Sequence, residues 1–195
     1  MAGRITRHCA VRIGASGHPV KKIAYLSLGS NMGNRAENLR QAISCLKEIG
    51  VITAVSSFYE TEPVEVVGPQ PWFVNCVVAL ETELLPRQLL ARTSSIELAM
   101  GRRRRTPDAP KAPRTVDIDL VLLGDTIVDA GGLTIPHPAM HRRRFVLEPL
   151  AEIAPTVLHP VLHQTPSQLL RALPGGEGKV RRIEVEQNEG FGNFQ

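Results

Sequence analysis

Residues 114–123 constrain the fold most, because they combine the pattern of a buried strand with two carboxylates. The stretch is rich in β-branched and aliphatic residues and is ended by Gly124 and Asp125. Residues two apart on a strand point to the same face, so we expect Asp117 and Asp119 to project side by side. The segment therefore predicts a strand that carries paired carboxylates on one face.

Two ionised carboxylates this close repel each other unless a cation lies between them. Oxygen ligands suit Mg²⁺, which takes one or two carboxylates and completes its shell with water and phosphate oxygens. The residues before the strand are strongly basic: Arg102, Arg103, Arg104, Arg105, Lys111 and Arg114. These cations predict a polyanion beside the metal. The alternative is a strand end at which the two aspartates cap a turn or pair with surface arginines.

The chain has 195 residues, which predicts one domain with a proper core. Its formal net charge is +4, and arginine is concentrated in residues 102–114 and 142–144. This distribution fits nucleic acid, a nucleotide or another phosphate ligand, without choosing among them.

We expect residues 1–21 to be a flexible basic extension, residues 22–173 to be the folded domain and residues 174–195 to be a flexible tail. No apolar run approaches the ~18 residues of a membrane span, and residues 1–21 lack the apolar core of a secretory signal. The three cysteines are widely spaced and form no metal or redox motif, which favours a reduced, cytoplasmic setting.

Hydrophobic periodicity predicts a strand over 23–29, a helix ending at Gly50, a strand over 51–59, a strand over 72–83 and a helix over 86–100. Asn34 is expected to cap the first helix. A proline-rich loop lies between the second and third strands, and a basic loop over 102–113 precedes the aspartate strand. A short hairpin within 126–135 and helices within 140–150 and 167–173 are expected to follow. The order strand–helix–strand, repeated, predicts a single ferredoxin-like α+β domain with helices packed on a mainly antiparallel sheet.

Phe73 and Asn75 lie on one face of the third strand, and an aromatic ring with an amide can bind a flat heterocycle. The alternative is that Phe73 is ordinary core and Asn75 a strand-end hydrogen bonder. His137, between two prolines, could donate to a phosphate or relay a proton, or make a structural hydrogen bond. The run 142–144 could clamp phosphates or be a solvated basic face. Gly29-Ser-Asn-Met-Gly33 lacks the lysine of a P-loop.

Taken together, several motifs resemble one family: Leu-Gly-Ser-Asn-Met-Gly at 28–33, Phe-Val-Asn at 73–75, Gly-Arg-Arg-Arg at 101–104, Pro-Arg-Thr-Val-Asp-Ile-Asp at 113–119 and Ile-Pro-His-Pro at 135–138. They are similar to 6-hydroxymethyl-7,8-dihydropterin pyrophosphokinase over roughly residues 22–173. The resemblance implies transfer of pyrophosphate from ATP to the pterin, giving AMP, in folate biosynthesis. It also implies two Mg²⁺ ions held by Asp117 and Asp119.

The resemblance assigns further roles by position. Catalytic residues would be Arg102, Arg114, Asp117 and Asp119. The pterin would contact Thr61, Glu62, Val64, Phe73, Asn75 and Phe145. ATP would contact Glu97, Arg104, Lys111, Leu120, Thr134, His137 and Arg143. The family usually has an arginine and an aromatic residue shortly before this Pro-Arg-Thr, and here only Lys111 offers a nearby cation.

A nucleic-acid-binding module is the second hypothesis, because single-strand RNA binders share this fold type. It predicts aromatic residues interleaved with arginine on adjacent strands, and it leaves Asp117 and Asp119 unexplained. We therefore expect ATP and a pterin as partners, without nucleic acid or membrane. We expect a monomer, with a weak dimer as the alternative.

Overall fold

The computed structural model describes residues 20–63, 70–101, 113–174 and 178–184. The elements in chain order are β1 (Lys22–Ser30), α1 (Arg35–Leu46), β2 (Val51–Val55), β3 (Phe58–Thr61), β4 (Phe73–Thr82), α2 (Pro86–Ala99), β5 (Asp117–Leu123), β6 (Val128–Ala130), β7 (Leu133–Ile135), the 3-10 helix η1 (Met140–Arg142), α3 (Arg144–Ile153), α4 (Pro166–Ala172) and β8 (Val180–Ile183).

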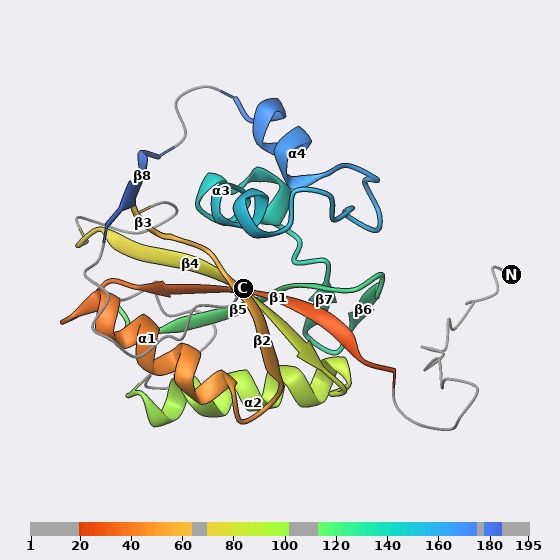
Figure 1. Cartoon of the computed structure of the whole chain (residues 1–195), viewed down its shortest axis with the longest axis horizontal. Helices are drawn as coiled ribbons and strands as arrows, with labels where there is room; N and C mark the ends of the chain where they lie inside the picture. Colours follow the sequence, from red (N-terminus) through yellow and green to blue (C-terminus); the bar gives the residue numbers. More distant parts are fainter. Residues whose placement is uncertain (1–19, 64–69, 102–112, 175–177, 185–195) are drawn as a thin grey trace, which may run out of the picture.

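The main sheet has the strand order β5-β1-β4-β3-β8, with β2 also paired to β4 (Figure 1). Every pairing in it is antiparallel. Strands β6 and β7 form a separate hairpin. Strand β1 lies between β4 and β5, the strand that carries the two aspartates. The predicted ferredoxin-like α+β class is confirmed.

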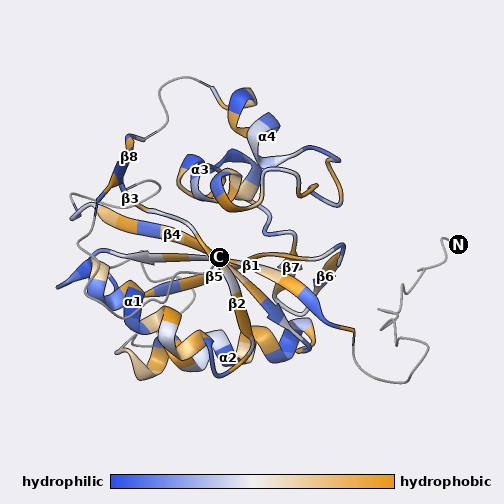
Figure 2. Ribbon diagram, viewed as in Figure 1, coloured by the Kyte–Doolittle hydropathy of each residue, from blue (hydrophilic) through white to orange (hydrophobic). Residues whose placement is uncertain are grey.

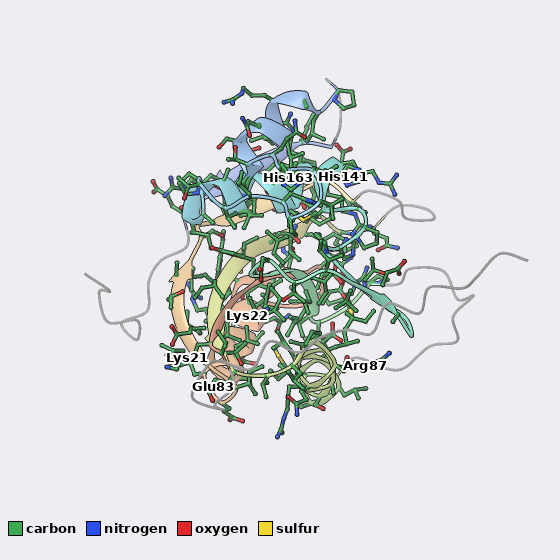
Figure 3. All side chains as sticks on the ribbon, turned by 90° about the vertical axis from the view of Figure 1, so that its right-hand side faces the viewer. Lys21, Lys22, Glu83, Arg87, His141 and His163 are labelled. Carbon is green, nitrogen blue, oxygen red and sulfur yellow. The ribbon has the colours of Figure 1, made fainter. Side chains whose placement is uncertain are left out.

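Helices cover both faces of the sheet: α1 and α2 lie on one side, and α3 and α4 on the other (Figure 1). Apolar residues line the sides of the helices that face the sheet (Figure 2). In the view turned by 90°, His141 and His163 lie in the layer of α3 and α4, whereas Arg87 lies in that of α2 (Figure 3). Three layers therefore enclose two cores.

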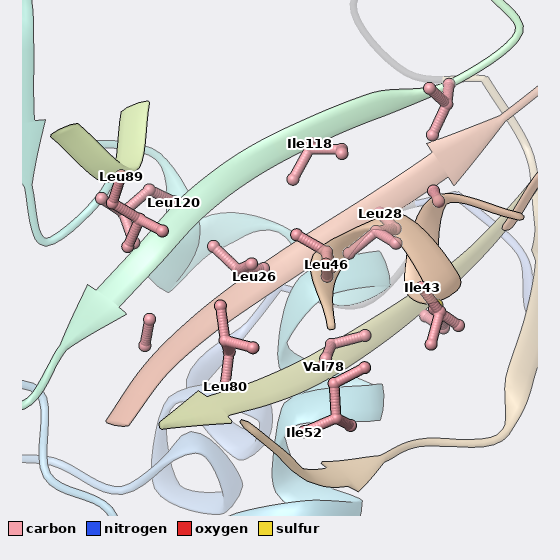
Figure 4. Packing of buried hydrophobic residues seen from close by; sticks show 14 of the residues in the cluster. Leu26, Leu28, Ile43, Leu46, Ile52, Val78, Leu80, Leu89, Ile118 and Leu120 are labelled. Atoms are coloured by element: carbon pink, nitrogen blue, oxygen red, sulfur yellow. The ribbon is translucent and has the colours of Figure 1, made fainter. Parts of the chain in front are cut away.

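The larger core lies between the sheet and helices α1 and α2 (Figure 4). Leu26 and Leu28 of β1, Ile43 and Leu46 of α1, and Leu89 of α2 are 0–1% exposed there. On the other face, Val77, Val121 and Leu147 form part of the second core, with α3 and α4. The two cores follow from the alternation of side chains along each strand, which gives every sheet face its own apolar set.

Local sequence signals set several element ends. The Asn34 side chain accepts a hydrogen bond from the Glu37 N–H at 3.2 Å, which is the predicted cap of α1. Pro86 occupies the first turn of α2, where its missing N–H has no helical partner to lose. Thr165 and Gln168 form a reciprocal capping box at the start of α4.

Three expectations differ from the structure. The first helix, predicted to end at Gly50, ends at Leu46, because the next three N–H groups bond to the carbonyl three residues back rather than four. Residues 51–59, predicted as one strand, form β2 and β3, and Ser56 between them bonds through its N–H and hydroxyl to the main chain of Val77. Apolar residues lie on both sides of Ser56 and Ser57, so the hydrophobic pattern alone does not reveal the break. Residues 180–183, expected in a tail outside the domain, form strand β8 at the sheet edge.

Within the described residues, no helix is both long and apolar enough to cross a membrane.

Candidate functional site

The candidate site is built across β4, β1 and β5, where Gly29 of β1 faces Asn75 on one side and Asp117 on the other. Two residues along, Ser27 faces Val77 and Asp119. Directly opposed residues of antiparallel strands have side chains on the same face. Asn75, Asp117 and Asp119 therefore share one face, separated by two small residues of the central strand, Gly29 and Ser27.

Gly29 is required by this close approach. A Cβ atom at this position would lie 2.5 Å from Asn75 Oδ1 and 3.6 Å from a ring carbon of Phe73. A glycine inside a strand often marks a place where a ligand or another group comes close to the backbone. Gly29 thus forms a buried strip of backbone without a side chain between the amide and the acid pair.

Both aspartates face arginines. Arg114 Nη1 lies 2.8 Å from Asp117 Oδ2, and Arg143 Nη1 lies 4.0 Å from Asp119 Oδ2. The Asp119 side chain is the more exposed of the two carboxylates, at 39% against 20%. Burial of its carboxylate and the negative charge of Asp117 raise the pKa of Asp119, against the opposing effects of His137, Arg143 and Arg114. The pair still carries mutual repulsion that a cation would relieve.

The main chain of Arg114 is fixed by a buried residue of the β1–α1 connection. Asn31 is 2% exposed, its Oδ1 accepts from the Arg114 N–H at 2.8 Å, and its N–H donates to the Arg114 carbonyl at 3.3 Å. The Arg114 guanidinium lies 5.9 Å from the centre of the Phe73 ring. Arg114 therefore connects the acid side of the site to its aromatic side.

On the amide side, Asn75 Nδ2 donates to Thr61 Oγ1 at 2.6 Å. Both residues are buried, at 4% and 3% exposure, whereas Phe73 is half-buried. The bond fixes the orientation of the amide and leaves its oxygen directed over Gly29. Glu62 follows at the surface, and its N–H donates to the carbonyl of Lys179 at 3.0 Å.

His137 and Phe145 approach from the segment after β7. The N–H of His137 donates to the Val121 carbonyl at 2.9 Å, and its Nδ1 accepts from the Ala139 N–H at 3.1 Å. Burial lowers the pKa of His137, and the charge of Asp119 opposes that effect. The Arg143 guanidinium lies 5.7 Å from the centre of the Phe145 ring. His137 can therefore make a structural hydrogen bond through Nδ1 and still use Nε2 to contact a phosphate or relay a proton.

Other predicted residues lie farther from this face. Leu120 is 5% exposed and packs in the core under α1 and α2, on the opposite face from Asp119. Glu97 of α2 is 6% exposed, and its carboxylate accepts from the Ile118 N–H at 2.8 Å, between the two aspartates. Thr134 donates its hydroxyl hydrogen to Asp129 within the β6–β7 hairpin. The structure brings Asp117, Asp119, Arg114, Arg143 and His137 together, but not the side chain of Leu120.

Four predicted residues, Val64, Arg102, Arg104 and Lys111, lie outside the described residues. His159 is 6% exposed, and its Nδ1 accepts from the N–H groups of Val161 and Leu162. Its position in the loop before α4 explains it as a structural hydrogen bonder.

Sequence reasoning missed Gly29, Ser27 and Asn31 as members of the candidate site. The available signal for Gly29 was a glycine within an otherwise apolar strand. Asn31 gives no such signal, because nothing local shows that its partner is Arg114, 83 residues further along the chain.

A family model described as 7,8-dihydro-6-hydroxymethylpterin-pyrophosphokinase matches residues 25–155. The chain belongs to this family. It is 42% identical over 140 residues to the 2-amino-4-hydroxy-6-hydroxymethyldihydropteridine pyrophosphokinase of Bacillus subtilis, covering 71% of this chain and 81% of that protein. The protein of the same name from Pseudomonas aeruginosa is 40% identical over 154 residues, covering 77% and 91%.

The chain is also 43% identical to the folic acid synthesis protein fol1 of Schizosaccharomyces pombe over 155 residues, which cover 78% of the chain but 21% of that protein. It thus spans about a fifth of that relative. The wild-type HPPK-DHPS structure of Plasmodium falciparum superposes with a TM-score of 0.63 at 18% identity, covering 78% of this chain and 42% of that one. This similarity supports the fold.

Proposed function

We propose that the protein transfers the pyrophosphoryl group of ATP to the hydroxymethyl group of 6-hydroxymethyl-7,8-dihydropterin, giving AMP and the pterin pyrophosphate for folate biosynthesis. Family membership supports the proposal. The structural observation that carries it is the shared face on which Asn75 and the Asp117–Asp119 pair flank Gly29. A heterocycle at the amide would thereby present its substituent toward the acid pair.

We assign the pterin to the amide side. The Asn75 amide, fixed by Thr61, offers a donor and an acceptor that match the edge of a pterin ring. Phe73 and Phe145 supply the aromatic faces, and Thr61, Glu62 and Val64 complete the set. Because Asn75 is oriented before the substrate arrives, little rotamer freedom would be lost on binding.

We assign the phosphates to the arginines around the acid pair. Among the described residues, Arg114 Nε is buried and makes no hydrogen bond, so it is a donor that a phosphate oxygen could satisfy. Arg143 lies on the other side of the pair, beside His137. Arg102, Arg104 and Lys111 would contact the phosphates from the basic segment, with Glu97, Leu120 and Thr134 on the nucleotide side.

The donor set fits Mg²⁺. The protein would supply the two carboxylates of Asp117 and Asp119, and no cluster of three or more potential ligands from His, Cys, Asp and Glu occurs among the described residues. Such a site suits an ion that takes its other ligands from phosphate and water. We propose two Mg²⁺ ions, which when bound would neutralise the phosphates and lower the pKa of the substrate alcohol.

In the reaction, the substrate oxygen forms a bond to the β-phosphorus, and the bond from that phosphorus to the α-phosphate oxygen breaks. AMP leaves with the electron pair, and the alcohol proton passes to solvent. The guanidiniums of Arg114 and Arg143 would stabilise the negative charge that develops on the leaving oxygen. Asn75 and the aromatic residues would hold the pterin so that its alcohol oxygen is in line with the bond that breaks at the β-phosphorus. Positioning is thus their main contribution to the reaction.

AMP formation with ATP, Mg²⁺ and the pterin tests the proposal. We expect turnover that needs all three components and stops when EDTA removes the metal. AMP formation without pterin, or none in the complete mixture, would contradict it. Salt-sensitive binding to single-stranded RNA, without ATP consumption, would favour a nucleic-acid-binding module.

We further propose that the protein is a monomer and that it is cytoplasmic. Light scattering tests the oligomeric state.

A further inference from the structure

Strand β8 lies beyond residues 25–155, which the family model matches, yet it pairs with the strand that leads to the candidate pterin residues. Its register with β3 places Val180 opposite Thr61 and Arg181 opposite Glu60. Thr61 is the residue that orients the Asn75 amide. The added strand therefore borders the amide side of the site directly.

Main-chain contacts continue past the end of β3. The Glu62 N–H donates to the Lys179 carbonyl at 3.0 Å, and the Lys179 N–H donates to a Glu62 carboxylate oxygen at 3.4 Å. Glu62 is thus held on both its main chain and its side chain by the residue before β8. This fixes the direction in which the chain leaves β3.

A second set of contacts, on the face of α1, centres on Glu60. Its carboxylate pairs with Arg181 of β8 through one oxygen, and with Arg35 Nη2 at 3.0 Å through the other. Burial of the Glu60 carboxylate raises its pKa, but hydrogen bonds from Arg181 and Arg35 outweigh that effect and lower the pKa overall. Glu60 is therefore ionised at neutral pH and available to both arginines.

Arg35 extends the connection to β4. Its Nη1 donates to the Trp72 carbonyl at 2.7 Å. The chain of contacts Arg181–Glu60–Arg35–Trp72 thus ends next to Phe73, just as Glu60 is next to Thr61. Two members of this chain of contacts, Glu60 and Trp72, each directly precede a candidate pterin contact in the sequence.

We propose that β8 positions the pterin-binding strands, with Arg181 and Glu60 acting as positioning residues that hold Thr61 and Phe73 in place through the backbone. The inference rests on the proposed function, since it concerns the pterin side of that site. Within the described part of the chain, the Arg181 side chain pairs with Glu60 and with none of the candidate binding residues, so its effect should pass through Glu60. It should therefore change pterin affinity rather than the chemical step.

The test compares Arg181→Ala with Arg182→Ala in the full chain. Both substitutions remove one charge from β8, but Arg182 lies on the other face of the strand, opposite Tyr59. Because the Arg181 side chain is 70% exposed, we expect a modest effect, a roughly twofold to fivefold rise in the pterin Kd. The Kd for an ATP analogue and kcat should stay within about twofold of the wild-type values, and Arg182→Ala should leave all three unchanged.

Two further measurements identify the route. In a Glu60→Gln background, Arg181→Ala should have no additional effect on the pterin Kd, because the interaction between the two residues is already broken. Hydrogen exchange of the Glu62 amide, which bonds to Lys179, should be faster in Arg181→Ala than in Arg182→Ala. Arg181→Lys should restore part of the wild-type affinity.

Equal pterin Kd values for the two alanine variants would overturn the inference, as would additive effects of Arg181→Ala and Glu60→Gln. A fall in kcat with an unchanged Kd would also contradict it. These outcomes require a wild-type protein that binds the pterin and forms AMP. A wild-type protein that does neither contradicts the proposed function instead, and the exchange measurement still reports whether Arg181 holds the Glu62 main chain.

Discussion

The two sides of the Gly29 strip are stabilised in different ways. On the β4 side, Asn75 and Thr61 are buried, neutral and hydrogen-bonded to each other at 2.6 Å. On the β5 side, Asp117 and Asp119 are partly exposed, charged and faced by arginines at 2.8 and 4.0 Å. The amide side is stabilised by its own hydrogen bond, whereas the acid side needs positive charges to offset its two carboxylates.

This difference has consequences for binding. A neutral ring can occupy the amide side without any protein group having to move from its partner. On the acid side, a metal ion would take over the compensation that Arg114 gives Asp117, which frees the guanidinium for a phosphate. Substitutions on the two sides should therefore separate substrate affinity from catalysis.

The largest effect is expected from Asp119→Ala, which removes half of the proposed metal site. AMP formation should fall about 10³-fold or more, because the charge of the phosphates would lose its main compensation. Thermal stability should not fall, because the substitution removes a carboxylate whose pKa is raised by burial and by the charge of Asp117. Activity assays over a range of Mg²⁺ concentrations, together with melting curves, check both expectations.

Asp125→Ala is the matched control for that experiment. Asp125 follows the same strand, but its side chain is 77% exposed and pairs with Lys22 at 3.5 Å, away from the acid pair. Its removal should leave AMP formation within about twofold of wild type. Comparable losses in the two variants would show that the acid pair has no special role.

Gly29→Ala should break the amide side alone. The added Cβ would lie 2.5 Å from Asn75 Oδ1, so the amide has to move from its position on Thr61. We expect a roughly tenfold or greater loss of pterin affinity, in line with one disrupted buried hydrogen bond. Ser27→Ala on the same strand adds no bulk and lies opposite Asp119, on the acid side, so it should leave the pterin affinity unchanged. Calorimetric titration of both variants distinguishes a steric effect from general damage to β1.

The fold could be predicted because its determinants are local. The cap at Asn34, the proline in the first turn of α2 and the alternation along β4 all lie within a few residues of the elements they define. The acid pair was visible for the same reason, since a spacing of two on a strand fixes its geometry. The break at Ser56 was hidden, because its partner Val77 lies on another strand.

The rest of the site depends on partners far apart in the sequence. Neither the role of Asn31 at Arg114 nor that of Lys179 at Glu62 leaves a local pattern, because both depend on strand order and register. The same holds for Glu97. The resemblance placed it at the nucleotide, whereas its carboxylate accepts the Ile118 N–H in the structure. Whether Glu97 also contacts ATP remains a prediction.

Glu97 links the acid pair to α2, and two substitutions separate its possible roles. Glu97→Gln keeps an acceptor for the Ile118 N–H and should preserve stability to within about 1 kcal/mol. Glu97→Leu leaves that buried donor without its partner, so the free energy of unfolding should fall by about 1–3 kcal/mol. Urea unfolding measures the difference, and the apparent Mg²⁺ affinity should weaken in the leucine variant only. Equal loss of stability in both variants would show that the charge of Glu97, rather than its bond to β5, matters.

The smallest expected effect concerns Glu60 and its dependence on pH. The arginines lower the folded-state pKa of Glu60 below its ordinary value of 4.5, so the folded state holds a proton less strongly than the unfolded state. The stabilisation is therefore fully present above that value and is lost as the pH falls through the lower folded pKa. At pH 7, Glu60→Gln should lower the free energy of unfolding by about 1 kcal/mol or less, since Arg181 is mostly solvated. The difference from wild type should shrink steadily below pH 4.5. Urea unfolding at several pH values checks this, with the exposed Glu48→Gln as the charge-matched control. A difference that persists unchanged in acid would mean that Glu60 stabilises the edge of the sheet by packing rather than by its ion pairs.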